Sequence, residues 1–232
     1  MIFKKTWLLI FILGFSSSLL AAPQPSHLEI GLGTYLFDYN ESVTPPLRSF
    51  EHGQVPYLEC RWTGPWTATL QGGMGKIAYN SSAPSDLVLA ALSVEKEEQT
   101  WFWGGSLKYW RRNVSNQYIE NYGWISVFVG PHWDIQVIKN LNLGIKAGLE
   151  YMPIAFMHFE SENVVFGMHG GIGYRVECPL TLTLNADQSV SITPWIHFYS
   201  FNASDVQNLS GVPSYEPSST TQVYGLTGRM SL

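Results

Sequence analysis

Acidic and basic side chains recur at every second position of several stretches that are otherwise apolar. In residues 141–151, for example, Lys146 and Glu150 alternate with leucine, isoleucine and tyrosine. Because alternate residues of a β-strand point to the same side of a sheet, such charges gather on one face. The full set is Glu29, Glu59, Arg61, Lys108, Lys146, Glu150, Arg175, Glu177 and Arg229. Its carboxylates and cations nearly balance, and buried charges need partners to offset their desolvation. We therefore predict a network of ion pairs rather than a catalytic carboxylate pair.

One histidine could act as a catalytic base. His197 and Ser200 are three residues apart, whereas a serine nucleophile two residues from the histidine would share its face of a strand. Unless a bulge intervenes, the two side chains point to opposite faces. His132 and Asp134 do share a face, but no serine or cysteine stands beside them, so we predict a hydrogen-bonded pair. The sequence shows no ligand spacing typical of a metal site, and we expect neither metal nor cofactor.

Strands are the elements that must carry these residues. Alternation of apolar and polar side chains predicts ten of them: 27–37, 54–62, 67–79, 86–95, 99–111, 122–135, 141–151, 164–177, 180–199 and 221–232. The segment 86–95 could instead be a short helix, which would leave eight strands, and the segment 180–199 is expected to break near 186–188. Apolar on one face and charged on the other, such strands are typical of an all-β, antiparallel, up-and-down transmembrane β-barrel.

Composition agrees with a barrel better than with helices. Hydrophobic residues make up 45% of the chain and charged residues 13%, yet the mean hydropathy is +0.00. After the N-terminal leader no apolar run approaches the length of a transmembrane helix. A soluble β-sandwich is the alternative. The net charge of −5 argues against a nucleic-acid partner. Cys60 and Cys178 lie on strands that should not be neighbours, so we do not expect a disulfide.

Both ends of the chain carry targeting signals. Lys4 and Lys5 precede an apolar stretch at 7–15 and small residues at 16–22, which predicts a secretory signal peptide, residues 1–21, cleaved after Ala21. Residues 22–232 then form a single barrel domain. At the other end the apolar face of the last strand predicts a membrane assembly signal read by the barrel assembly machinery. It consists of Tyr224, Leu226, Met230 and Leu232.

Connection lengths predict which end of the barrel faces outward. Short links near 64–65, 96–98, 139–140 and 178–179 are expected as periplasmic turns, and the longer segments 39–53, 112–121 and 202–220 as extracellular loops. The pair Gly72-Gly73 is expected to mark a bulge, and Phe166, Met168 and Ile172 are expected to face outward together. Interfacial aromatic residues are expected at both rims: Trp62, Trp66 and Trp133 at the short-turn rim, and Phe156, Phe159, Trp195 and Phe198 at the other.

Several segments carry a resemblance to a known group. They are residues 37–41, 51–56, 108–112, 118–122 and 215–226. On these segments the chain resembles an uncharacterised group of Gram-negative outer-membrane β-barrel proteins, a resemblance that implies a fold and a location but no activity. In size it is similar to the ten-stranded omptin proteases, whose pattern includes an Asp-x-His sequence. Because this chain contains no Asp-x-His, protease activity is not carried over.

Together these patterns predict a non-enzymatic integral outer-membrane barrel. A barrel of about ten strands has little free interior, so the charge-balanced lumen should be filled, and binding should occur through the extracellular loops. Its expected partners are outer-membrane lipid and an unidentified surface ligand. Two alternatives stay open. One is an outer-membrane hydrolase of lipid or peptide at the loop rim with His197 as base, and the other is a narrow pore for small solutes.

Overall fold

The described part of the chain is built from strands. The computed structural model describes residues 26–42, 49–79, 84–115, 118–185 and 188–232, so the predicted signal peptide lies outside the described residues. The strands are β1 (His27–Glu41), β2 (Ser49–Thr63), β3 (Thr67–Tyr79), β4 (Ser85–Glu98), β5 (Trp101–Ser115), β6 (Tyr118–Ile138), β7 (Leu141–Phe159), β8 (Val164–Met168), β9 (Gly171–Glu177), β10 (Leu180–Thr183), β11 (Ser189–Phe201), β12 (Gln207–Leu209), β13 (Val212–Ser214) and β14 (Ser219–Ser231). Within these residues no helix is long and apolar enough to cross a membrane.

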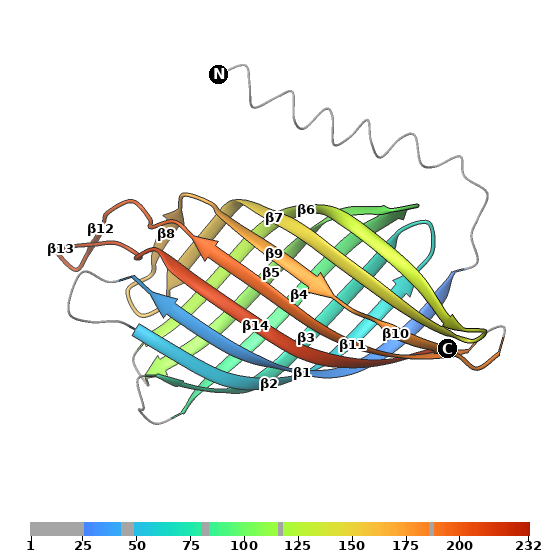
Figure 1. Ribbon diagram of the computed structural model, residues 1–232. Helices are drawn as coiled ribbons and strands as arrows, with labels where there is room; N and C mark the ends of the chain where they lie inside the picture. Colours follow the sequence, from blue (N-terminus) through green and yellow to red (C-terminus); the bar gives the residue numbers. More distant parts are fainter. Residues whose placement is uncertain (1–25, 43–48, 80–83, 116–117, 186–187) are drawn as a thin grey trace, which may run out of the picture.

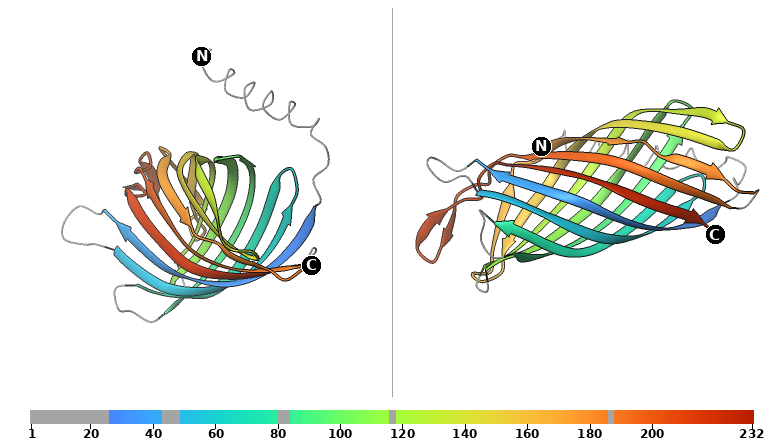
Figure 2. Two further views of the ribbon diagram at one scale, coloured as in Figure 1. Left: turned by 45° about the vertical axis from the view of Figure 1, so that its right-hand side comes forward. Right: turned by 60° about the horizontal axis from the view of Figure 1, so that its bottom comes forward.

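Antiparallel pairing closes the sheet into a barrel. From β1 to β7 each strand pairs with the next, β14 pairs with both β1 and β11, and β9 and β10 each pair with β7 on one side and β11 on the other. The short strands β8, β9 and β10 are therefore successive segments of one wall strand. The result is a closed, ten-stranded, up-and-down barrel (Figures 1 and 2), which confirms the predicted fold class. The fourth predicted strand is also confirmed as β4.

The period of two places apolar side chains outside and charges inside. On β7, Leu149 is 73% exposed while its neighbour Glu150 is 2% exposed and faces the lumen. Leucine, isoleucine and valine side chains cover the outer surface of most strands. A band of this kind suits contact with hydrocarbon, since the lumen-facing polar groups are shielded from it.

The eighth wall strand changes face in its middle. Phe166 and Met168 on β8 are buried inside the barrel, whereas Ile172 on β9 is 66% exposed on the outside, so the prediction that all three face outward is wrong. The strand is interrupted between Met168 and Gly171, where Gly170 adopts a φ of +80°. On the neighbouring β7, the pairing with β6 shifts by one residue around Pro153. These irregularities shift the phase of the alternation.

The predicted strand 180–199 is also wrong, because the chain does not turn at Cys178 and Pro179. Pro179 interrupts the ladder, as it has no N–H to donate, but the strand continues: the Cys178 N–H donates to the Pro194 carbonyl (3.0 Å) and the Pro179 carbonyl accepts from Gly144 (2.7 Å). β10 therefore extends the eighth wall strand. The turn to the ninth wall strand, β11, follows at 184–188.

The loops are shorter than expected, with one exception. β5 and β6 extend through most of the predicted loop 112–121, leaving 116–117 between them, and the β1–β2 connection spans 42–48. The segment 202–218 is the long one, and it carries the hairpin β12–β13 beyond the barrel end (Figure 1). The expected bulge at Gly72-Gly73 is absent, since β3 keeps one register with both neighbours. Gly73 instead permits close approach: a Cβ there would lie 2.6 Å from the Pro56 carbonyl oxygen.

Two of the aromatic side chains expected at the rims lie inside. Trp62 and Trp133 are exposed on the outer face at the short-turn end, as predicted. Phe159 and Trp195, however, are packed in the lumen, so their outward assignment is wrong. Phe198 is on the outer face and stacks on Tyr174, with ring centroids 5.1 Å apart.

Candidate functional site

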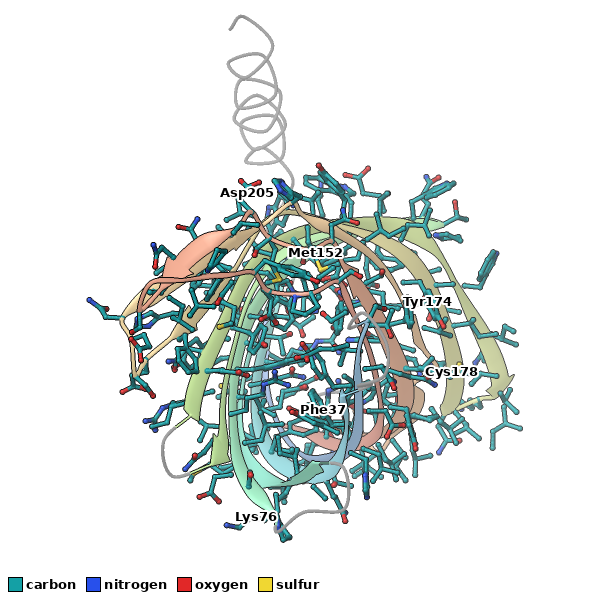
Figure 3. The ribbon with its side chains drawn as sticks, turned by 90° about the vertical axis from the view of Figure 1, so that its left-hand side faces the viewer. Phe37, Lys76, Met152, Tyr174, Cys178 and Asp205 are labelled. Carbon is teal, nitrogen blue, oxygen red and sulfur yellow. The ribbon has the colours of Figure 1, made fainter. Side chains whose placement is uncertain are left out.

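Side chains fill the lumen in three successive layers. Nearest the short turns is the ion-pair layer, which contains the nine predicted charged residues together with Glu95 and Glu97. Above it is the aromatic layer, which we define as Phe37, Trp110, Trp124, Tyr199 and Phe201. At the long-loop end is the mouth cluster, which we define as Tyr39, Glu41, Glu51, Arg112, Glu120, Tyr122 and Glu216. Figure 3 views the barrel from the long-loop end, with Phe37 inside the ring of strands.

Every member of the ion-pair layer has an oppositely charged neighbour. Arg229 on β14 pairs with Glu59 on β2, Lys108 with Glu150 (3.1 Å), Arg175 with Glu177, and Arg61 with Glu29 (3.8 Å) and Glu95 (3.6 Å). Lys146 pairs with Glu95 (2.8 Å) and Glu97. Neutral groups complete the network: Gln71 donates to Glu59 (2.7 Å) and Ser126 to Glu150 (2.5 Å). Six carboxylates therefore face five cations in this layer.

The pairing partners are set by cross-strand geometry. Arg229 and Glu59 lie on β14 and β2, on either side of β1, opposite Gly31 in both registers. A Cβ at Gly31 would lie 3.2 Å from Arg229 Cγ and 3.3 Å from Glu59 Cβ. Glycine at this position therefore allows the two long side chains to meet over the intervening strand.

A cavity of about 90 Å³ remains beside the ion-pair layer. Its walls include Arg61, Glu95, Lys108 and Glu177, and aromatic side chains of Tyr35 and Trp195. Trp195 donates to the Tyr57 hydroxyl (3.2 Å) and to Thr227 (3.0 Å), which fixes the indole in the wall. A space of this size accommodates a few water molecules, and its polar walls can solvate them.

The aromatic layer blocks the lumen above this cavity. Trp110 packs edge-on against Phe37 and Trp124, with centroid distances of 5.0 and 4.6 Å. Trp124 in turn contacts Tyr199 (5.6 Å) and Phe201 (5.4 Å). These rings come from β1, β5, β6 and β11, on opposite sides of the barrel, and Trp124 is 1% exposed. Apolar side chains of β2 to β4 and β7 to β8 surround them in one continuous core.

A single guanidinium organises the mouth cluster. Arg112 on β5 contacts carboxylates from three other strands: Glu41 (3.0 Å), Glu51 (2.8 Å) and Glu120 (2.5 Å). It also donates to the Tyr122 hydroxyl (2.8 Å) and lies over the rings of Tyr39 and Tyr122, 4.4 and 4.9 Å from their centroids. Since such contacts engage all three guanidinium nitrogens, Arg112 ties four wall strands together.

Glu216 enters this cluster from the long loop. It is buried, and its carboxylate accepts hydrogen bonds from Tyr122 (2.7 Å) and Tyr39 (3.4 Å). Burial is the main cause that raises the pKa of Glu216 to about 8; the negative charges of Glu120 and Glu41 raise it further, while Arg112 and the Tyr122 hydrogen bond act in the opposite direction. Glu216 is therefore mainly protonated at neutral pH.

The structure places His197 and Ser200 on opposite faces of β11. His197 faces the lumen, 3.5 Å from Glu177 and 3.0 Å from the Tyr199 hydroxyl. Ser200 pairs with outward-facing Ile172, whereas His197 pairs with inward-facing Arg175, so the serine is on the other face. His132 is 3.7 Å from exposed Asp134. Among the described residues no group of histidine, cysteine and carboxylate side chains is placed to hold a metal ion. Cys60 and Cys178 are both free.

Sequence reasoning missed most of the mouth cluster. Its members come from the five segments on which the resemblance rests: 37–41, 51–56, 108–112, 118–122 and 215–226. Two signals in the sequence pointed to it, the two-residue spacings Tyr39/Glu41 and Glu120/Tyr122, which place a phenol and a carboxylate on one face. The predicted assembly-signal residues Tyr224, Leu226, Met230 and Leu232 are all exposed on the outer side of the last strand.

Comparison with known proteins yields likenesses of fold. No known family description and no curated protein matches the sequence. Among solved structures, the chain is similar to the outer-membrane protease OmpT from Escherichia coli, with 7% identity, a TM-score of 0.48 and coverage of 92% of this chain and 99% of that one. It is also similar to Neisserial surface protein A (9%, TM-score 0.39, 88% and 98%) and to an outer-membrane channel from Pseudomonas putida F1 (8%, TM-score 0.40, 90% and 96%). The barrel architecture of this chain is given by its own strand pairing.

Proposed function

We propose that this chain is a non-enzymatic integral outer-membrane barrel with a sealed lumen, which acts through its extracellular loops. The observation that carries the proposal is the aromatic layer, in which the rings of Phe37, Trp110 and Trp124 meet across the barrel. Beneath it, ion pairs such as Lys108–Glu150 and Arg175–Glu177 lie around a cavity of about 90 Å³. In a barrel closed in this way, a partner would bind to the long loop that contains β12 and β13.

The geometry gives less support to the two alternatives. A hydrolase using His197 would need a nucleophile beside the ring, but Ser200 faces the lipid side. It would also need its substrate to pass the aromatic layer. A narrow pore would need a continuous path, and the contacts between Trp110 and Trp124 lie across any such path. For a pore, neutralising Arg175 or Glu150 would change the conductance.

Conductance of the purified protein in planar lipid bilayers tests the proposal. We expect no steady current through the native barrel, because the aromatic layer excludes hydrated ions. The double substitution Trp110→Ala and Trp124→Ala removes two large rings from that layer and should produce a measurable current. Trp133→Ala removes an indole from the outer face (49% exposed) and is the matched control, which should stay silent. A large steady conductance of the native protein would overturn the proposal.

A further inference from the structure

The long loop 202–218 is attached to the barrel at both ends and at one point inside it. At its start, Asn202 donates its backbone N–H to the Gly170 carbonyl (3.1 Å), and Ser204 bridges to Met168. At its end, the Ser218 carbonyl accepts from the Ser42 N–H (2.8 Å). Inside the loop, the backbones of Ser204 and Glu216 are joined, with the Ser204 N–H donating to the Glu216 carbonyl (2.9 Å).

The side chain of Glu216 is the loop's anchor in the mouth of the barrel. It reaches the phenols of Tyr122 and Tyr39, and its own N–H donates to Ser204 Oγ (2.8 Å). Because β12 and β13 lie between Ser204 and Glu216 in sequence, these contacts fix the base of the hairpin. Exposed Val206 and Val212, each more than 60% accessible, then project from this base.

The charges around Glu216 leave it without a cation of its own. Arg112 is the cation of the mouth cluster among the described residues, and its three nitrogens already contact Glu41, Glu51 and Glu120. Glu216 is thus a fourth carboxyl beside one guanidinium. Ionising it would add a buried negative charge near Glu41 and Glu120, which is unfavourable in a site of low polarity.

We propose that Glu216 is a pH-operated latch: protonated, it holds the loop 202–218 in the barrel mouth, and its ionisation in mildly alkaline medium releases the loop. The groups that face Glu216 are Tyr39 and Glu41 of β1, Arg112 of β5, and Glu120 and Tyr122 of β6. Glu51 of β2 contacts the same Arg112. Repulsion from the neighbouring carboxyl groups of Glu41 and Glu120 supplies the driving force for release. The latch would control which surface of the loop is displayed outside the cell, and this role rests on the proposed function. The latch itself rests on the geometry of the mouth cluster.

Loop mobility measured by spin labelling tests the latch directly. In a background with Cys60→Ser and Cys178→Ser, a nitroxide at Val212→Cys reports on the hairpin, and one at Lys139→Cys in a short turn is the control. In detergent, the Val212 label should become more mobile as the pH rises from about 5 to about 8, the range in which Glu216 is ionised in a released loop but protonated in an anchored one, and its mobility should level off above pH 8. Within that range the ratio of mobile to immobile label should rise by at most about tenfold per pH unit. The Lys139 label should not change.

Substitutions in the cluster separate the latch from general loosening of the barrel. Glu216→Gln keeps the shape and stays neutral, so its loop should remain immobile up to pH 10. Glu120→Gln removes a neighbouring negative charge that opposes ionisation of anchored Glu216. With less repulsion, its loop should be released less than the native loop at pH 9. A native loop whose mobility is constant with pH would overturn the latch, as would an unchanged transition in either variant. Conductance plays no part in this readout, so a conducting native barrel would refute only the proposed function.

Discussion

Replacing Arg229 tests whether the lumen charges act as matched pairs. The change Arg229→Met keeps much of the side-chain volume but leaves Glu59, whose side chain is fully buried, without its cation. Glu59 would retain only the hydrogen bond from Gln71, and Thr193 would lose the donor that Arg229 provides (2.8 Å). Removing one partner of a buried ion pair costs about 3–5 kcal/mol, because the remaining charge stays desolvated.

A double-mutant cycle separates the loss of the ion pair from other effects of the Arg229 substitution. Adding Glu59→Gln to Arg229→Met removes both charges, so the double variant should recover much of the lost stability. The control is Lys76→Met, which breaks an exposed pair with Asp86 whose side chains are 66% and 61% accessible. That loss should be about 0–1 kcal/mol. Urea titration of the barrel folded in lipid vesicles, followed by tryptophan fluorescence, measures each free energy of unfolding. If Arg229→Met costs no more than Lys76→Met, the matched-pair reasoning is refuted.

Four further predictions concern other parts of the barrel. Gly33→Ala would place a Cβ 2.4 Å from the Tyr57 ring and should destabilise the barrel by about 1–3 kcal/mol in the same titration, whereas Gly72→Ala, which meets open space, should be neutral or stabilising by up to about 1 kcal/mol. The pKa of Glu216 is raised from 4.5 to about 8, so its stabilising contribution is full below about pH 4.5 and is lost as the pH rises to about 8, at most about 5 kcal/mol in all; Glu216→Gln should flatten that part of a stability–pH profile. Tyr122→Phe removes a donor that favours ionised Glu216 in the anchored loop, so the Val212 label should be more mobile at pH 9 than in the native protein. Finally, the native protein from isolated membranes should migrate differently on a gel with and without boiling, and an unshifted, soluble protein would contradict a closed barrel.

The sequence was sufficient to predict the barrel because alternation survives in most strands. Along β7 every second residue from Leu141 to Tyr151 is apolar, and the structure keeps that phase. The errors arise where the phase breaks. Gly170 and the register shift around Pro153 move Phe166 and Met168 inside. A pattern of period two contains no information on such a shift until a backbone irregularity is known.

Pairing across the lumen was beyond sequence reasoning for a different reason. Alternation assigns a side chain to a face, but the partner depends on strand stagger and on reach across the barrel. Lys146 on β7 meets Glu95 on β4, which is 51 residues away in sequence, and Arg112 gathers carboxylates from β1, β2 and β6. The same limit explains why His197 was considered as a catalytic base from the sequence alone. The sequence could not show that the Tyr199 hydroxyl lies beside Nδ1 of His197 and the Glu177 carboxylate beside Nε2.

The order of the three layers bears on how the barrel could respond to its surroundings. The aromatic layer, with Trp124 almost fully buried, separates the mouth cluster from the ion-pair layer. A change of pH at the long-loop end would therefore reach Glu216 first, while the ion pairs beneath Trp110 stay shielded by several large rings. Because each ion-pair carboxylate already has a cation, and Glu216 has only phenols, the group most easily switched is also the one that holds the loop. This arrangement lets the loop move while the wall of the barrel keeps its stability.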